Sequence, residues 1–213
     1  MVGFAAFFRN TARAVLIFLA CFAAQAAHAQ IYVDINASGA NNGSSWSNAY
    51  TDLQDAINTA SGSDEIWIAQ GVYVPGNSRS DSFEIDDSKN GIRIYGGFGG
   101  NESNRADRNP SDHPTVLSGD VDGNDDTNAS GYITAGSQLN GNNSYHVVEL
   151  DGRDGGFTRS TILDGIIITG GQPGNGDSAN DRVDFGGGIL CDGSSGGRCN
   201  PTLSNLILAG NVA

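Results

Sequence analysis

The residues best suited to chemistry lie in one acidic run, Asp120-Val121-Asp122-Gly123-Asn124-Asp125-Asp126. Side chains with oxygen ligands alternate along it: Asp120, Asp122, Asn124 and Asp126. The first half of a calcium-binding loop presents its ligands with this spacing. The run departs from an EF-hand because Asp125 occupies the position of the turn glycine and Gly131 that of the closing glutamate. Two interpretations stay open: a looser calcium site and a solvated acidic turn.

The first 29 residues are typical of a secretory signal peptide. Arg9 and Arg13 give a positively charged start, and residues 14–24 form an apolar stretch. Ala27-His28-Ala29 then supplies the small residues that precede a cleavage site. Cleavage is therefore predicted before Gln30.

Two alternatives to this cleavage stay open. One is an uncleaved membrane anchor, for which the apolar stretch is shorter than the roughly 20 residues of a spanning helix. The other is a lipoprotein cleaved at Cys21, where the bulky Leu19 stands in place of a small residue. In each case the mature chain is expected to be secreted or held at the cell surface.

Acidic residues dominate the chain. It has 11 basic and 24 acidic residues and a formal net charge of −13. Arg9 and Arg13 leave with the signal peptide, so residues 30–213 carry a net charge of −15. Such a surface repels nucleic acid and anionic membranes, and no nucleic-acid partner is predicted. Divalent cations are compatible with it.

Two cysteines, Cys191 and Cys199, follow the predicted cleavage site and flank a segment rich in glycine and serine. In an oxidising compartment this arrangement predicts a local disulfide. A metal site at these two cysteines is less favoured, because no other thiol remains and the two remaining histidines, His113 and His146, do not lie at ligand spacing from each other.

Short apolar runs recur along the chain and end on glycine or a small polar residue: residues 92–97, 147–152, 166–171 and 206–211. Runs of this length predict strands, and their recurrence at a loose period of roughly 20–30 residues predicts a solenoid. Long connections without alternating helices favour parallel coils over an α/β fold. An antiparallel sandwich is the main alternative.

One helix is predicted near the start of the mature chain. Thr51-Asp52-Leu53-Gln54 has the pattern of a capping box, and Gly62 is a fitting stop. The apolar residues of one helical face are Leu53, Ala56, Ile57 and Ala60. The helix is expected to cover the end of the stack. The predicted organisation is a signal peptide (1–29), an N-terminal strand and capping helix (30–62), and β-helix coils (63–213).

Several motifs resemble those of secreted bacterial proteins: residues 64–73, 95–102, 115–120, 186–190 and 200–206. The first three resemble the opening coils of the pectin-lyase-like superfamily. The last two look like repeats of its polymorphic outer-membrane-protein and adhesin-like branch. The resemblance implies an all-β, right-handed parallel β-helix, located at the bacterial outer membrane or outside the cell.

The resemblance also implies two functions. The favoured one is a non-catalytic, adhesin-like protein whose loops bind an extracellular glycan or a cell-surface partner. The alternative is a calcium-dependent polysaccharide lyase of the pectate type, or a related glycan-active enzyme, with calcium as the only cofactor. Catalytic residues stay unassigned, because Lys89, Arg93 and Arg153 form no group distinct from ordinary surface charge.

The last apolar run is followed at once by Asn211-Val212-Ala213. A β-helix that ended there would expose unpaired backbone and an apolar cross-section. The coils are therefore predicted to be truncated, with further repeats or an anchor expected after Ala213. No transmembrane segment is predicted in residues 30–213.

Overall fold

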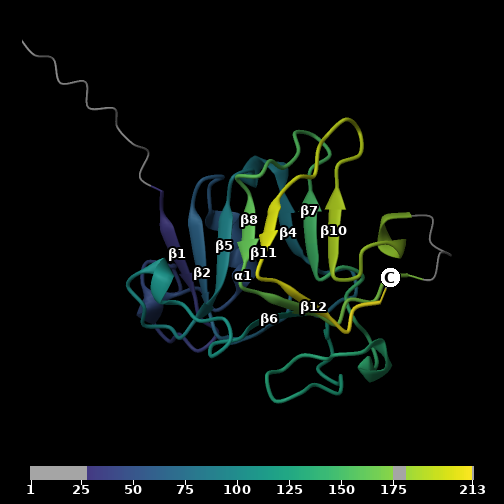
Figure 1. Ribbon diagram of the computed structural model, residues 1–213, viewed down its shortest axis with the longest axis horizontal. Helices are drawn as coiled ribbons and strands as arrows, with labels where there is room; N and C mark the ends of the chain where they lie inside the picture. The colour runs from purple at the N-terminus through teal and green to yellow at the C-terminus, as the bar shows by residue number, and fades with distance from the viewer. Residues whose placement is uncertain (1–27, 175–180, 213) are drawn as a thin grey trace, which may run out of the picture.

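The computed structural model describes residues 28–174 and 181–212, and nearly all of the predicted signal peptide lies outside them (Figure 1). Twelve strands and one α-helix make up the regular structure of this part, so the fold is mainly β. Short 3-10 helices also occur, at Trp46–Asn48 (η1), Asp87–Lys89 (η2), Arg105–Asp107 (η3), Gly136–Gln138 (η4) and Asp181–Asp184 (η5).

The strands form three sheets. The five-stranded sheet has the order β1 (Gln30–Val33), β2 (Glu65–Ala69), β5 (Arg93–Phe98), β8 (Ile162–Asp164) and β11 (Thr202–Ser204). The four-stranded sheet has the order β12 (Ile207–Ala209), β9 (Ile167–Thr169), β6 (Thr115–Ser118) and β3 (Gly71–Tyr73). The three-stranded sheet has the order β10 (Ile189–Asp192), β7 (Val148–Asp151) and β4 (Phe83–Asp86).

From β2 onward the chain visits the five-, four- and three-stranded sheets in turn and then repeats the circuit. Every pairing between these strands is parallel. Each circuit, here called a coil, therefore adds one strand to each sheet, and the colours of Figure 1 run across the stack in chain order. This arrangement excludes the antiparallel sandwich and is compatible with a β-solenoid.

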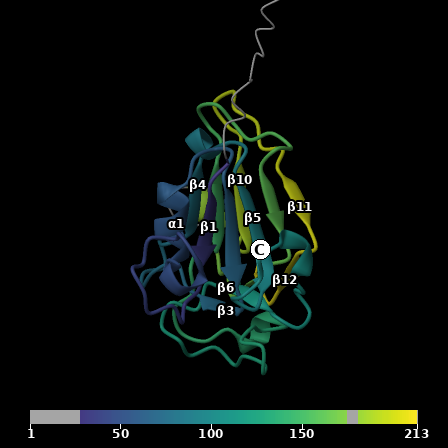
Figure 2. The ribbon, with the colours of Figure 1, turned by 90° about the vertical axis from the view of Figure 1, so that its left-hand side faces the viewer.

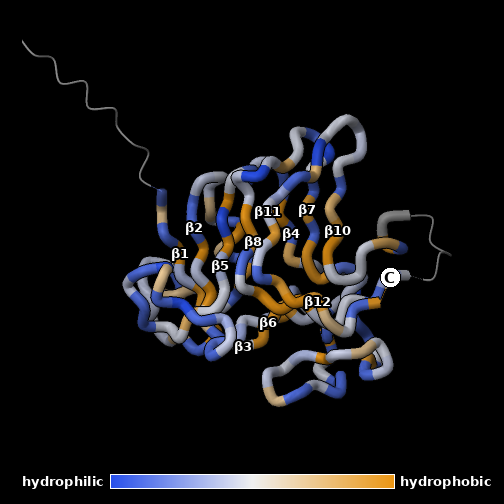
Figure 3. Tube along the Cα trace, in the orientation of Figure 1, coloured by the Kyte–Doolittle hydropathy of each residue, from blue (hydrophilic) through white to orange (hydrophobic). Residues whose placement is uncertain are grey.

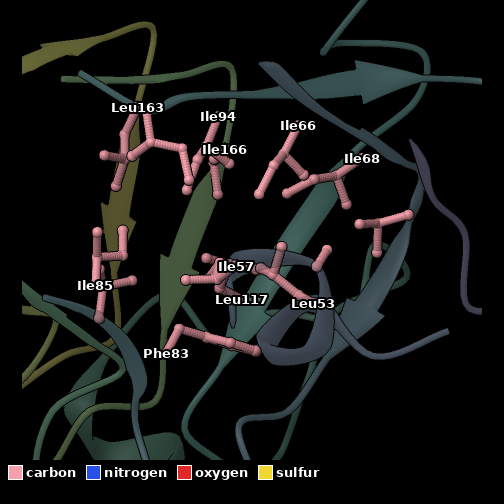
Figure 4. Packing of buried hydrophobic residues seen from close by; sticks show 14 of the residues in the cluster. Leu53, Ile57, Ile66, Ile68, Phe83, Ile85, Ile94, Leu117, Leu163 and Ile166 are labelled. Atoms are coloured by element: carbon pink, nitrogen blue, oxygen red, sulfur yellow. The ribbon is translucent and has the colours of Figure 1, made fainter. Parts of the chain in front are cut away.

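The core lies between the three sheets. Alternate residues of a strand face opposite sides of its sheet. The pairing aligns one row of the five-stranded sheet that is buried at Ile31, Ile66, Ile94 and Leu163 and 46% exposed at Leu203, in the last strand. Figure 4 shows side chains from several strands and the helix converging, among them Ile66, Phe83 and Leu117. Burial of each such side chain contributes about 1.5–3 kcal/mol to folding. Apolar residues follow the strands in Figure 3, while the loops are mostly hydrophilic.

The helix α1 (Leu53–Thr59) buries Leu53, Ala56 and Ile57 and packs against β1, β2 and β4 (Figure 2). Its first turn differs from the expected capping box. Asp52 is the N-cap and accepts the N–H of Gln54, because its carboxylate competes successfully for that donor. The amide of Gln54 instead exchanges two hydrogen bonds with the backbone of Glu84 in β4.

The C-terminal end of α1 is held by Lys89. Its Nζ donates to the carbonyl oxygens of Asn58 (2.9 Å) and Ala60 (2.7 Å), which have no partner within the helix. We expect Lys89→Met, which keeps the aliphatic stem, to lower the free energy of unfolding by about 1 kcal/mol. Urea denaturation followed by circular dichroism measures this. Lys89→Arg keeps the charge and should lose less; equal stability of wild type and the Met variant would contradict the assignment.

Two corners of the stack have related sequences. Residues 162–170 and 202–210 each run from the five-stranded to the four-stranded sheet. In these segments β8 pairs with β11 and β9 pairs with β12, residue for residue. The corner positions are Gly165 (φ 75°) and Asn205 (φ 49°), both in the left-handed region. Glycine and asparagine are the residues that adopt this conformation at least cost.

Candidate functional site

The outer face of the five-stranded sheet carries one row of aligned side chains. The strand register places them in the order Tyr32, Trp67, Tyr95, Asp164 and Ser204. Three aromatic rings are thus followed along the stack by a carboxylate and a hydroxyl. This row is the base on which the candidate site is built.

The aromatic part of the row is covered by neighbouring segments. The rings of Trp67 and Phe98 stack with centroids 4.6 Å apart, and Trp46 lies 4.7 Å from Tyr32 and 5.5 Å from Phe98. The indole N–H of Trp46 donates to the carbonyl of Glu102 (2.9 Å). These aromatic side chains therefore support the segment after β5 and are not free to stack on a ligand.

The segment after β5 is shaped by Glu102. Its carboxylate accepts the backbone N–H groups of Gly99 (2.6 Å), Gly100 (3.1 Å) and Asn101 (3.0 Å). Partial burial raises the pKa of Glu102, but these hydrogen bonds outweigh it and leave the pKa below its ordinary value. The ionised carboxylate therefore fixes the start of the segment that carries η3.

Two arginines from this segment lie over the same ring. The guanidinium carbons of Arg105 and Arg108 lie 4.6 Å and 5.3 Å from the centroid of Tyr95. Nη1 of Arg105 lies 2.6 Å from Glu65, yet 46% of the Arg105 side chain stays exposed. Nη2 of Arg108 lies 2.8 Å from Asp164, and both of these side chains are only 15% exposed. Arg105 is thus accessible, whereas Arg108 is held in place.

Asp164 connects successive coils. Besides Arg108, its carboxylate accepts Nδ2 of Asn205 (2.9 Å) and Oγ of Ser204 (2.8 Å). Burial raises the pKa of Asp164, but the hydrogen bonds from Asn205, Arg108 and Ser204 outweigh it and lower the pKa overall. The ionised carboxylate of Asp164 therefore connects Arg108, in the segment after β5, with the corner between β11 and β12.

A groove of about 640 Å³ opens beside these residues. It crosses three successive coils, and the side chains that define it are Arg105, Arg108, Pro110, Ile167, Asn205 and Ile207. Guanidinium groups thus border a partly apolar surface. Among the described residues that line it there is no histidine, cysteine or carboxylate. This lining suits a ligand with an anionic group and an apolar face.

The predicted calcium residues lie elsewhere, in the long excursion between β6 and β7. Asp120 accepts the N–H groups of Asn124 and Asp125 (both 3.0 Å), and Asp122 accepts an N–H from later in the same excursion. Asp126 is exposed. Within residues 28–174 and 181–212, no three His, Cys, Asp or Glu side chains are grouped so that they could hold a metal ion. These carboxylates brace a loop backbone, and calcium binding stays a prediction.

The same excursion is anchored to the four-stranded sheet. Ile133 is fully buried, its N–H donates to Oγ1 of Thr169, and that hydroxyl donates to the Ile133 carbonyl (both 3.2 Å). Asp125 is the carboxyl of this loop with a raised pKa, because burial and the nearby Asp120 and Asp122 outweigh the hydrogen bonds that it accepts.

The structure joins Cys191, in β10, to Cys199 by a disulfide, with Cα atoms 5.7 Å apart. Cys199 forms a parallel bridge with Phe157, so the disulfide ties β10 to the connection that leads toward β11. It lies in the scaffold and does not line the groove.

The residues of the groove carry no local signal in the sequence. Arg108 and Asp164 are 56 residues apart, and only the pairing of β5 with β8 brings their surroundings together. The repeat of residues 162–170 at 202–210 was the available signal, because it aligns Asp164 with Ser204 and Gly165 with Asn205.

No family model, curated protein or solved structure matches this chain. The parallel β architecture is compatible with a β-solenoid, and the resemblance to pectin-lyase-like proteins stays a prediction from the sequence motifs. Among the described residues, no helix is long and apolar enough to cross a membrane.

Proposed function

We propose that this chain is a secreted, right-handed parallel β-helix that binds an extracellular acidic glycan through the arginine-bordered groove, without catalysis. The three parallel sheets visited in turn support the β-helix. A right-handed course agrees with the strong preference of parallel crossover connections for that hand. The proposed location is the bacterial cell surface or the extracellular medium.

The single observation that carries the proposal is the pairing of Arg105 and Arg108 over Tyr95 beside the groove. Guanidinium groups bind carboxylates and sulfates through two parallel hydrogen bonds. The apolar floor, which includes Ile167 and Ile207, offers contact to the C–H face of a sugar ring. Because the chain is strongly acidic overall, this arginine pair marks the surface suited to an anionic ligand.

The groove also fits an elongated ligand. Its lining comes from the coil of β5, the coil of β8 and the coil of β11, so it runs along the stack. A polymer that lies along this axis would contact each coil in turn, because stacked repeats form an extended surface.

The test is binding of acidic oligosaccharides by Arg105→Gln. We expect an affinity about tenfold weaker than wild type, since one charge-assisted contact of about 1.4 kcal/mol is removed. Isothermal titration calorimetry with oligogalacturonates and sulfated oligosaccharides measures it. Arg159→Gln removes the same charge at an exposed position outside the groove and should bind as wild type does. An equal loss of affinity in both variants, or no binding by the wild-type protein, would contradict the proposal that the groove is the binding site.

An activity assay on the same wild-type protein distinguishes binding alone from the alternative function, a polysaccharide lyase. Wild type is incubated with polygalacturonate in calcium and in chelator, and the absorbance of unsaturated products is followed. Product that appears only with calcium would replace the binding proposal with a calcium-dependent lyase. Binding without product supports the non-catalytic reading.

A further inference from the structure

The apolar floor of the groove belongs to an outward row of the four-stranded sheet. The strand register aligns Val72, Val116, Ile167 and Ile207 along successive coils. The adjacent row, which includes Leu117, lies in the core, so this row faces away from the core, because alternate residues of a strand face opposite sides. Val116 is fully buried and Ile167 is 7% exposed, whereas Ile207 is 48% exposed. The row is therefore open to a ligand at Ile207, which lines the groove.

This floor is aliphatic. Among the described residues that line the groove none is aromatic, and the ring of Tyr95 is only 5% exposed beneath Arg105 and Arg108. The side chains of Pro110 and Ile207 have no hydrogen-bonding group. A hydroxyl group of a ligand that rested on them would lose its water without gaining a partner, which costs free energy. The floor therefore suits an apolar substituent that carries no O–H group.

The groove is also polarised along the stack. Arg105 lies over Tyr95 in the coil of β5, whereas Ile207 lies two coils later, in the coil of β11. Adjacent strands of a sheet lie about 4.8 Å apart, so these two features are separated along the stack by roughly 10 Å, about the length of a disaccharide. A ligand that uses both features carries its anionic group and its apolar group on the same short stretch of chain.

Resting on the proposed function, we infer that the glycan in the groove is an O-acetylated acidic polysaccharide. Arg105 binds a carboxylate of this glycan, and an acetyl methyl group packs on Ile207. Esterification of a sugar hydroxyl with acetate removes a donor that the floor cannot satisfy and adds a methyl group that the floor can cover. Ser111 and Asn205, the exposed uncharged polar residues of the lining, stay available to the hydroxyl groups of the same sugars.

The test compares two forms of one ligand. Oligogalacturonates are O-acetylated chemically, and part of the preparation is returned to the free hydroxyl form with mild alkali, so that both forms have the same length and charge. We expect isothermal titration calorimetry to show that the wild-type protein binds the acetylated form about fourfold more tightly, because one methyl group is buried. In saturation-transfer NMR, the acetyl methyl protons should receive the strongest saturation.

Ile207→Thr tests the floor directly. Threonine keeps the β-branched shape that suits a strand but replaces apolar surface with a hydroxyl group. The variant should bind the two forms with affinities within about twofold of each other and should bind the de-acetylated form as the wild-type protein does. Ile35→Thr is the matched control, because Ile35 is 43% exposed and does not line the groove. It should keep the full preference for the acetylated form.

The outcomes separate this inference from the proposed function. Equal affinity of the wild-type protein for the two forms would overturn the role of the acetyl group and would leave the groove as a site for acidic glycans. A preference that survives in Ile207→Thr, or that falls equally in Ile35→Thr, would overturn the contact with Ile207. If neither form binds, the proposed function is wrong, and the inference fails with it.

Discussion

Replacing Asp164 with asparagine is expected to lower the free energy of unfolding by about 2 kcal/mol. The substitution removes the charge that pairs with Arg108 and leaves that guanidinium in a site where both side chains are largely buried. Removing one partner of such a pair costs more than the pair contributes, since the other charge stays desolvated. The amide also offers one acceptor oxygen where the carboxylate offers two, so the bonds from Ser204 and Asn205 cannot all be kept.

The stabilisation by Asp164 should also depend on pH. The pKa of Asp164 lies below its ordinary value of 3.8 in the fold. Its carboxylate therefore stabilises the protein above pH 3.8, and this contribution is lost as the pH falls through the lower folded pKa. Urea denaturation between pH 3 and pH 7 should show wild type and Asp164→Asn differing most near neutrality and converging in acid.

The matched control is Asp154→Asn, which removes an equal charge from an exposed position. Its stability should stay within about 0.5 kcal/mol of wild type. A constant difference between wild type and Asp164→Asn down to the most acidic sample would mean that the ionised pair is not the cause. Binding of acidic oligosaccharides should also weaken in Asp164→Asn, because Arg108 loses the contact that positions it.

Gly97→Ala is expected to be the other severe substitution, at about 3 kcal/mol of unfolding free energy. Gly97 has φ 93°, and a methyl group there would lie 2.5–2.8 Å from the ring and backbone of Pro110. The left-handed conformation costs an alanine roughly 1–2 kcal/mol, and overpacking adds about 1–3 kcal/mol. The neighbouring backbone has little room to move, since the N–H of Gly97 donates to Thr115 and its carbonyl accepts Asn109.

Gly123→Ala is the control that measures the cost of the backbone conformation without a steric clash. Gly123 also has a positive φ, 69°, but a methyl group there meets nothing within 4 Å. Gly123→Ala should therefore cost only the conformational part, roughly 1–2 kcal/mol. Urea denaturation of both variants separates conformational strain from steric overlap. Equal costs would show that the segment containing Pro110 moves aside freely, and oligosaccharide binding by the folded variant would show whether Arg105 and Arg108 move with it.

The elements of the fold were largely predictable because their signals are local. The apolar runs at 92–97 and 147–152 coincide with β5 and β7, since side chains that alternate or cluster over a few residues specify a strand. Their recurrence predicted stacked parallel strands, which the structure confirms. The sequence predicts the start of α1 one residue too early, because Thr51 and Asp52 are both good cap residues. In the structure Asp52 is the N-cap, and the backbone N–H and hydroxyl of Thr51 donate to Asn41.

The candidate site was not predictable in the same way. The acidic run from Asp120 is conspicuous because its oxygen-bearing side chains are close in sequence, but in the structure Asp120 accepts backbone N–H groups of its own loop. Arg105, Arg108 and Asp164 become neighbours only through strand register and through a segment that folds back over the sheet. Such contacts depend on loop conformation, which alternation of residue types does not encode.

The winding of the chain also determines how strain and stability spread through it. Each strand pairs only with strands of the preceding and following coils, so the molecule behaves as a one-dimensional row of units coupled to their nearest neighbours. Partial unfolding should therefore begin at a terminal coil and proceed from one coil to the next. The groove crosses three coils. A ligand bound along it would therefore contact all three, and would stabilise them against separate unfolding although each coil packs only on its immediate neighbours.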